Sequence, residues 1–173
     1  MLHPPLRTQD TPNVPIRSSV ATPSLTPRHA EVLRRSAIDL AVAAEAGCVS
    51  VTPDDPRLEA FADYQRADGI LFPVHPPDGS NGRYQLRRDR DRVTTDPKTG
   101  KQRSAKYEQP TGQAHRLDIH PRSRIHLRDV TIPLYVTEGI KKAWALTSLG
   151  RAAIALGGVW CCLLYTSPSP RDS

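Results

Sequence analysis

The stretch IPLYVTEGIKKAWALTSLGRAAIALGGVW, residues 132–160, decides the fold of this chain. It begins with a short apolar, partly β-branched run, which is typical of a strand covered on both faces in a parallel sheet. From Ile140 onward apolar residues recur at helical spacing as far as Gly150, a common left-handed end of a helix. Residues 151–156 (RAAIAL) form a second strand of the buried type. The stretch therefore predicts a parallel β-α-β unit and an α/β fold class.

An acidic residue, Glu138, follows the first of these two strands. We expect that strand to be central, and open α/β sheets place their chemistry at the carboxyl ends of such strands. Two interpretations of Glu138 stay open. The side chain is either a catalytic or metal-binding carboxylate, or it stabilises the start of the following helix by interacting with the helix dipole.

Two lysines, Lys141 and Lys142, lie in the first turn of the predicted helix. The helix dipole disfavours cations at that end. A bound phosphate would reverse this effect, because exposed N–H groups and two ammonium groups would converge on it. The alternative is a pair of solvated lysines on an outer face. Trp144 is expected in the core, with stacking on a base as the alternative.

Residues 136–160 resemble the first motif of the Toprim domain, the catalytic module of bacterial-type primases, topoisomerases and related nucleases. From residue 25 to residue 160 the chain is also similar to a Toprim-like family of phage, plasmid and other mobile-element replication proteins, domain of unknown function 3854. The segments that carry this similarity are LTPRHAEVLRRSAID, YQLRRDRDR, KYEQPTG and VTEGIKKA.

The resemblance implies a primase-like DNA replication protein that performs Mg²⁺-dependent phosphoryl or nucleotidyl transfer. In Toprim proteins the glutamate of this motif works beside an Asp-x-Asp that holds the metal, so Glu138 is the implied catalytic and metal-binding residue. Mg²⁺ takes oxygen ligands, commonly one or two carboxylates plus phosphate oxygens. No Asp-x-Asp follows Glu138 in this sequence. We therefore expect an inactive fragment of the intact enzyme; the alternative is a non-catalytic nucleic-acid-binding or adaptor module with a degenerate Toprim fold.

The end of the chain, CLLYTSPSPRD at residues 162–172, resembles a translated transposase-type sequencing adaptor. We exclude it from fold reasoning, with a natural Ser/Pro tail as the alternative. Four segments are then expected. They are a disordered Pro/Ser/Thr-rich leader (1–24), a helical and basic β-hairpin region (25–131), the truncated start of a Toprim-like, Rossmann-like domain (132–161), and the adaptor-derived tail (162–173).

The composition of the 173-residue chain limits its class. With 17 prolines and a hydrophobic content of 38%, part of the chain is not used for a core. Outside the tail, Cys48 and Cys161 cannot build a disulfide framework or a zinc ribbon. No apolar run approaches the length of a membrane span, and the start lacks the apolar core of a signal peptide. We expect a cytoplasmic, reducing environment and no membrane partner.

The segment after the leader predicts a helical pair. Thr26-Pro27 is a start signal for a short helix. Residues 36–39 (SAID) fit a capping box for a second helix that ends at Gly47, followed by a strand at residues 48–51. We expect the pair to pack on the sheet, although a separate function stays open.

Two shorter elements are expected between this pair and the basic region. Asp55-Pro56 opens a short helix that reaches residue 62. Residues 70–74 form a strand that Pro73 confines to an edge or ends early.

The most charged stretch is residues 83–106, with nine basic and three acidic residues. This excess equals the formal net charge of the whole chain, +6. Residues 84–86 and 105–107 are predicted as strands flanking a long turn with DPKTGK at its tip. Arginines interleaved with tyrosines suit single-stranded DNA or RNA, with a solvated hairpin as the alternative. The candidate nucleic-acid-binding residues are Arg83, Arg87, Arg88, Arg90, Lys101, Arg103, Lys106 and Tyr107, together with Lys141 and Lys142. A replicative helicase, as a domain or a separate protein, is a further candidate partner.

Three other features of the sequence disfavour metal, phosphate-loop and serine-nucleophile chemistry. His115, His120 and His126 have spacings that share no strand or helix face, which disfavours a metal site. The run DPKTGK lacks the first glycine and the Ser/Thr of a phosphate loop. No GxSxG nucleophile elbow occurs.

Overall fold

The computed structural model describes residues 25–80, 83–113 and 115–157. The elements begin with helices α1 (Pro27–Arg34) and α2 (Leu40–Glu45), strand β1 (Val49–Val51) and two 3₁₀ turns, η1 (Pro56–Leu58) and η2 (Asp63–Gln65). Strands β2 (Gly69–Pro73), β3 (Tyr84–Thr95), β4 (Gln102–Glu108) and β5 (Asp118–Ile119) follow. Helix α3 (Pro121–Arg124), strand β6 (Leu134–Thr137), helix α4 (Ile140–Ser148) and strand β7 (Ala152–Ala155) complete the described chain. The predicted leader and tail lie outside these residues.

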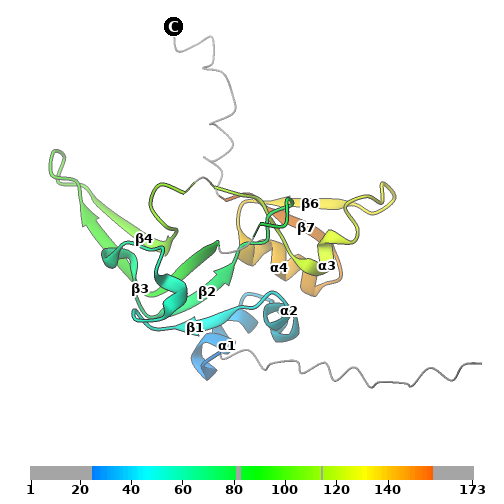
Figure 1. Ribbon diagram of the computed structural model, residues 1–173, viewed down its shortest axis with the longest axis horizontal. Coiled ribbons are helices and arrows are strands. Elements are labelled where there is room, and N and C mark those ends of the chain that lie inside the picture. The colour runs from blue at the N-terminus through cyan, green and yellow to red at the C-terminus, as the bar shows by residue number, and fades with distance from the viewer. Residues whose placement is uncertain (1–24, 81–82, 114, 158–173) are drawn as a thin grey trace, which may run out of the picture.

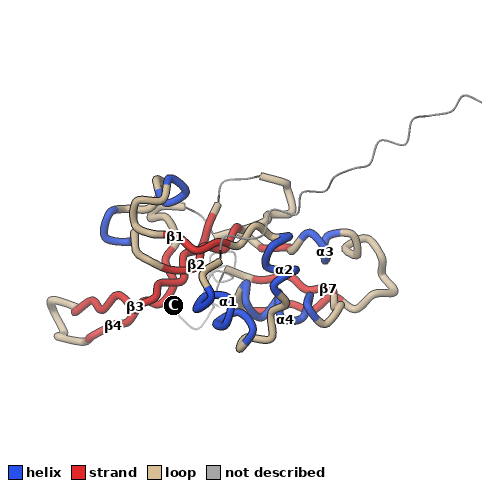
Figure 2. Tube along the Cα trace, turned by 90° about the horizontal axis from the view of Figure 1, so that it is seen from below, coloured by secondary structure: helices blue, strands red, loops and turns tan. Residues whose placement is uncertain are grey.

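The strands form two sheets in a mixed α/β arrangement (Figure 1). One has four strands in the order β1-β2-β3-β4, all antiparallel. The other has three strands in the order β5-β7-β6, in which β6 and β7 are parallel and β5 is antiparallel to β7. Figure 2 shows the β3–β4 hairpin extending away from α1, α2 and α4.

The predicted parallel strand-helix-strand unit is confirmed in β6, α4 and β7. Thr137 lies opposite Ala155 in the parallel register, and Gly150 takes the left-handed conformation after α4, with φ 70°. The prediction that the first strand is central is wrong for the described residues, because β6 lies at the edge and Val136 is 60% exposed. A short apolar run does not distinguish an edge strand from a buried one. The inner position belongs to β7, which β5 borders on its other side.

Each of the two N-terminal helices begins after a residue whose side chain accepts a hydrogen bond from a backbone N–H of the first turn. The Thr26 side chain accepts a hydrogen bond from the backbone N–H of His29, as predicted. The predicted capping box at residues 36–39 is wrong, because Asp39 itself caps α2 by accepting from the N–H of Ala41. The Ser36 hydroxyl donates instead to the carbonyl of Val32 in the preceding helix.

The elements around β2 also differ from the predictions. The helix expected from Asp55-Pro56 is only the 3₁₀ turn η1, and η2 follows it. Strand β2 is interior to its sheet, and Pro73 is its last residue, so the early end rather than the edge position applies. Gly69 makes the pairing with β3 possible, because an added Cβ would lie 2.2 Å from the carbonyl oxygen of Arg87.

The β3–β4 hairpin is longer than its predicted strands. Regular pairing resumes beyond a bulge between Arg87 and Arg92, and it continues to Thr95 opposite Gln102. Only residues 96–101 form the turn, so the predicted long turn is mostly strand. Apolar alternation is absent from this part of the sequence because this part of the hairpin covers no core.

One hydrophobic core joins α1, α2, α4, β2 and β7. Trp144 lies at its centre with no exposed surface, as predicted, and its ring centroid is 5.3 Å from that of Phe72. Burial raises the pKa of the Cys48 thiol to about 12, so Cys48 packs there as a neutral apolar side chain. The proposed division between residues 131 and 132 stays a prediction, although residues from both of its sides contribute to this core.

His120, buried beside Trp144, provides a pH-dependent contribution to stability. Its Nε2 bonds the carbonyl of Val42 at 3.0 Å, and its Nδ1 accepts from the N–H of Arg122 at 3.1 Å. Nε2 therefore carries the single proton of a neutral imidazole. Burial, the dominant cause, lowers the pKa of His120 below its usual 6.5.

We expect the free energy of unfolding to fall as the pH drops below about 6.5, because the unfolded chain then binds a proton that buried His120 resists. Chemical denaturation at a series of pH values from about 5 to about 7.5, the range in which an ordinary histidine changes its charge, measures this slope. His120→Gln should flatten the slope, whereas His126→Gln should not. An unchanged slope in His120→Gln would assign the effect to other groups.

Candidate nucleic-acid interface

A cleft of about 580 Å³ lies where the two sheets meet. The ends of β2, β3 and β4 meet there with β5, the end of β7, and the turn from β6 into α4. Its lining residues are Ser36, Val74, Gln85, Tyr107, Gln109, Arg116, Asp118, Glu138, Gly139, Ile140, Lys141, Lys142, Ala155, Leu156 and Gly157. Four predicted site residues are therefore brought together: Tyr107, Glu138, Lys141 and Lys142.

The first turn of α4 presents positive charge to this cleft. Lys141 is partly buried, and burial is the main cause that lowers its pKa from the usual 10.5. Arg87 and Lys106 lower the pKa further because their charges repel the ammonium group. The three cations come from three different elements, α4, β3 and β4. Their mutual repulsion favours an anion at this place.

Arg87 and Tyr107 are cross-strand partners in the hairpin. Burial raises the pKa of Tyr107, and the Arg87 guanidinium, which bonds the phenol, partly opposes this rise. The Nε of Arg87 is buried and meets no hydrogen-bond acceptor among the described residues. A buried unpaired donor costs free energy, so a ligand oxygen that reached it would be stabilised. Tyr107 remains 38% exposed and leaves part of its ring surface open.

Glu138 and Lys142 form an ion pair at the rim of the cleft. The Lys142 ammonium donates to the Glu138 carboxylate one helical turn away, and both side chains are more than half exposed. An exposed pair of this kind is weakly held, so both groups remain available to a ligand.

Asp118, the other carboxylate lining the cleft, is already occupied. It is 1% exposed, and its oxygens accept hydrogen bonds from the backbone N–H of His75 at 2.8 Å and from the Trp144 Nε1 at 3.1 Å. In the described ranges, no three His, Cys, Asp or Glu side chains are placed to hold a metal ion. Glu138 alone does not fit the carboxylate set implied for Mg²⁺.

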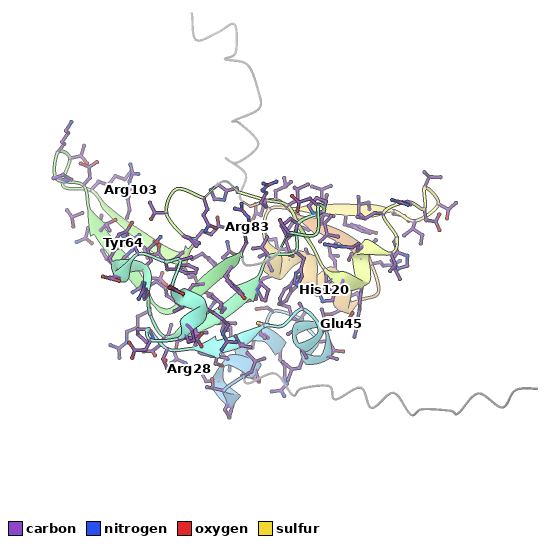
Figure 3. The ribbon with its side chains drawn as sticks, viewed as in Figure 1. Arg28, Glu45, Tyr64, Arg83, Arg103 and His120 are labelled. Carbon is purple, nitrogen blue, oxygen red and sulfur yellow. The ribbon has the colours of Figure 1, made fainter. Side chains whose placement is uncertain are left out.

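The remaining predicted residues lie elsewhere. Arg88 turns into the body, where it donates to the carbonyl of Gln65 at 2.9 Å. Arg90, Lys101 and Arg103 are exposed farther along the hairpin. Arg83 lies nearer the second sheet, as Figure 3 shows, and lines a small hollow next to the cleft.

A second hollow, on the side of α1, contains Arg90 together with His29, Ser50 and Asp89. His29 is 5% exposed and bonds Ser50 Oγ at 2.7 Å and Asp89 Oδ1 at 2.9 Å. These bonds join α1 to β1 and β3. Their evident effect is to hold the helix on the sheet.

Sequence reasoning missed Gln85, Gln109 and Asp118 as cleft residues. The signal for Asp118 was a carboxylate between two apolar residues, Leu117 and Ile119. The two glutamines gave no pattern, since they line the cleft only because the hairpin base meets β7. The run DPKTGK is a closed turn whose N–H groups at Lys98 and Thr99 donate to Asp96 at 2.8 and 3.2 Å.

Comparison with known proteins agrees with this architecture. The sequence profile of the domain of unknown function DUF3854 matches residues 124–170, which include β6, α4 and β7. The match overlaps residues 162–173, whose adaptor-like origin stays a prediction. No curated protein matches the chain.

Two solved structures are similar to this chain. The zinc-binding and RNA polymerase domains of the Aquifex aeolicus primase match with a TM-score of 0.51 and 15% identity, over 77% of this chain and 38% of that one. The DnaG primase catalytic domain bound to ssDNA matches with a TM-score of 0.48 and 17% identity, over 83% and 49%. The chain thus spans less than half of either structure. The first similarity shows a primase-like fold. In the described part of the chain, no helix is long and apolar enough to cross a membrane.

The lowered pKa of Lys141 predicts an alkaline loss of anion affinity. Because the proton leaves Lys141 below the usual 10.5, phosphate contacts there should weaken at a lower alkaline pH than the contacts of an ordinary lysine, as the pH rises towards 10.5. Tyr107 loses its proton later than an ordinary tyrosine, since its pKa is raised. Lys141→Arg should remove the pH dependence because a guanidinium keeps its charge.

Binding of single-stranded oligo(dA), whose bases do not titrate in this window, measures the effect by fluorescence anisotropy. An equal alkaline loss in Lys141→Arg would show that another group titrates.

Proposed function

We propose that the cleft binds the phosphate backbone of single-stranded nucleic acid and that the chain is part of a primase-like replication protein. The observation that carries the proposal is the convergence of Arg87 and Lys106, beside the cleft, on Lys141, which lines it. Each lies on a different element, so the fold rather than local sequence brings them together. Separated cations brought together at a cost in repulsion indicate an anionic ligand.

The aromatic and helical parts of the cleft fit the same ligand. The exposed part of Tyr107 offers a face on which an unpaired base can stack. The start of α4 adds N–H groups and a favourable dipole for a phosphate beside Lys141. Charge, stacking and backbone donors together are what single-strand binding requires.

For the intact protein, the proposal extends to Mg²⁺-dependent nucleotidyl or phosphoryl transfer at Glu138. Its support is the resemblance of the β6–α4–β7 sequence to the Toprim motif, together with the position of Glu138 at the carboxyl end of β6 and at the rim of the cleft. When bound, Mg²⁺ would neutralise charge on a phosphate. Among the described residues, Glu138 would be its carboxylate ligand.

A second function, a non-catalytic nucleic-acid-binding module, is favoured by one observation. The Glu138 carboxylate accepts a hydrogen bond from Lys142, and the other carboxylate that lines the cleft, Asp118, is buried and hydrogen-bonded to His75 and Trp144. Such a site binds phosphates without activating them. A binding measurement does not distinguish the two functions, because both require binding. The effect of replacing Glu138 on nucleotide transfer does distinguish them.

Salt-dependent binding tests the interface itself. Lys106→Gln/Lys141→Gln should reduce the slope of log K against log salt for single-stranded DNA by about 1 to 1.5. The reason is that binding with fewer phosphate contacts releases fewer counterions from the DNA. Arg34→Gln/Arg128→Gln removes the same charge from exposed positions away from the cleft and is the matched control. Equal slopes for both variants would place the phosphate contacts outside the cleft.

Glu138→Gln separates enzyme from binding module in the complete protein. We expect it to abolish Mg²⁺-dependent nucleotide transfer and to leave single-strand affinity within about twofold, because only the metal contact needs a charged carboxylate. Glu31→Gln, an exposed glutamate on α1, controls for general charge effects. Unchanged turnover in Glu138→Gln would remove Glu138 from the mechanism and support the binding module.

A further inference from the structure

We propose that the outer part of the β3–β4 hairpin, residues 90–104, is a separate binding surface for duplex DNA. We call this segment the arm. From Val93 to Ser104 every residue except Asp96 is exposed. Figures 1 and 2 both show the arm projecting from the body. It therefore offers two strands and a turn to a partner without covering any core of this chain.

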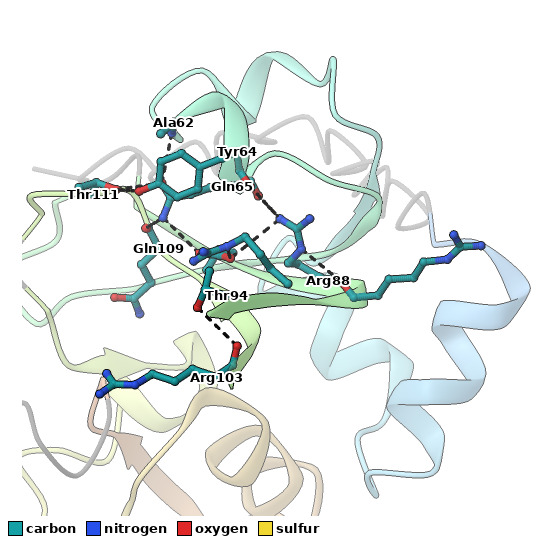
Figure 4. Close-up of polar contacts among 11 residues, drawn as sticks. Ala62, Tyr64, Gln65, Arg88, Thr94, Arg103, Gln109 and Thr111 are labelled. Carbon is teal, nitrogen blue, oxygen red and sulfur yellow. Dashed lines mark hydrogen bonds and ion pairs between the residues drawn. The ribbon is translucent and has the colours of Figure 1, made fainter. Parts of the chain in front are cut away.

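The arm is built to keep its shape without a core. An isolated two-stranded ribbon is marginal in water. At its base Arg92 donates to the buried Glu108, with Nε 2.6 Å from one carboxylate oxygen and Nη2 3.3 Å from the other. The same guanidinium lies 5.1 Å from the centre of the Tyr64 ring. Figure 4 shows the surrounding bonds from Gln65 and Arg88. At its tip, Asp96 closes the turn through backbone N–H groups.

The free charge of the arm is positive. The side chains of Arg90, Lys98, Lys101 and Arg103 form no ion pair with any described residue. Two acidic side chains offset part of this charge and are hydrogen-bonded within the arm: Asp91 accepts from the Ser104 hydroxyl at 2.9 Å, and Asp96 closes the turn. Four unpaired cations on a projecting ribbon indicate a partner with a dense negative charge, such as a nucleic-acid backbone.

The side chains of the arm fit a duplex better than a single strand. No aromatic residue occurs from Gln85 to Lys106, so unpaired bases find no stacking surface there. The major groove of B-form DNA, about 12 Å wide, admits a two-stranded β-ribbon. Polar side chains that can reach phosphates or base edges are exposed on both strands and in the turn, namely Thr95, Thr99 and Gln102. The hydroxyls of Thr94 and Ser104 donate to Arg103 and Asp91 within the arm. The major groove of A-form RNA is too narrow for side chains to read, so DNA is the expected duplex.

The arm differs from the cleft in the ligand it takes. The cleft combines cations with the exposed Tyr107 and suits unpaired bases, whereas the arm combines cations with hydroxyl and amide groups. The two surfaces can be removed independently, because no arm cation lines the cleft. The arm proposal therefore stands or falls separately from single-strand binding.

Lys98→Gln/Lys101→Gln/Arg103→Gln in the full chain tests the proposal. These exposed side chains form no hydrogen bond or ion pair with another described residue, so the hairpin should form unchanged. For duplex DNA of mixed sequence, we expect the slope of log K against log salt to fall by about 2 to 3, with at least tenfold weaker binding at low salt. Single-stranded DNA affinity should change less than twofold. The matched control is Arg34→Gln/Arg128→Gln/Arg151→Gln, which removes the same charge elsewhere.

Three results would overturn the proposal. The first is an unchanged affinity of the arm variant for duplex DNA. The second is an equal loss of duplex affinity in the control variant. The third is that the unchanged chain binds duplex RNA as tightly as duplex DNA, and that the arm variant loses affinity for both to the same extent. A second variant, Glu108→Gln, checks the role of the arm's base. It should lower the midpoint of chemical denaturation, because Arg92 loses a charged acceptor. It should also weaken duplex binding more than single-strand binding.

Discussion

The junction between the two sheets depends on the buried carboxylate of Asp118. One oxygen accepts from the backbone N–H of His75 at 2.8 Å, and the other accepts from Trp144 Nε1 at 3.1 Å. These bonds link the end of β2, strand β5 and helix α4, and the backbone pair from Ile119 N–H to the His75 carbonyl at 3.0 Å adds to them. A buried charge is tolerated only when its hydrogen bonds are satisfied, so Asp118 fixes the relative position of these elements. The cleft exists because of this fixed position.

The cations of the basic stretch serve three different purposes once the chain is folded. Arg88 and Arg92 form hydrogen bonds within the protein: Arg88 donates to the backbone carbonyl of Gln65, and Arg92 donates to the Glu108 carboxylate. Arg87 and Lys106 are gathered with Lys141 beside the cleft. The outer cations stay free on the arm. The bulge between Arg87 and Arg92 separates the base of the hairpin from the arm, because it interrupts the register between the cleft-facing and outward parts. One charged stretch therefore makes one buried network and two surfaces of different chemistry.

Local signals predicted the parts of the fold that local physics decides. The Thr26 cap, the left-handed Gly150, the alternation of strand and helix after residue 132, and the buried Trp144 depend on residues within one or two turns. Capping was misplaced at α2 because Ser36 and Asp39 both qualify, and the choice of Asp39 follows from its backbone N–H reaching Ser148 of α4. That bond spans 109 positions and leaves no local trace.

The candidate site shows the same limit. Glu138, Lys141 and Lys142 were found from their place before and within a helix, and Tyr107 from its basic neighbours. Their meeting with Gln85, Gln109 and Asp118 depends on how two sheets pack, which no spacing along the chain encodes. The sequence also does not predict which arginines form internal bonds and which remain free. It depends on Glu108, a single acidic residue just beyond the basic stretch.

The edge position of β6 bears on the proposed chemistry. Leu134 and Val136 are 45% and 60% exposed, and β6 pairs only with β7 in the described chain. A parallel strand paired with the other side of β6 would end beside Glu138, because the carboxyl ends of parallel strands meet at one edge of a sheet. Acidic residues at the end of such a strand would complete the carboxylate set that Mg²⁺ needs, and they would compete with Lys142 for Glu138. The ion pair of Glu138 with Lys142 therefore favours the binding module in the described chain, whereas acidic residues on a strand paired with β6 would favour the enzyme.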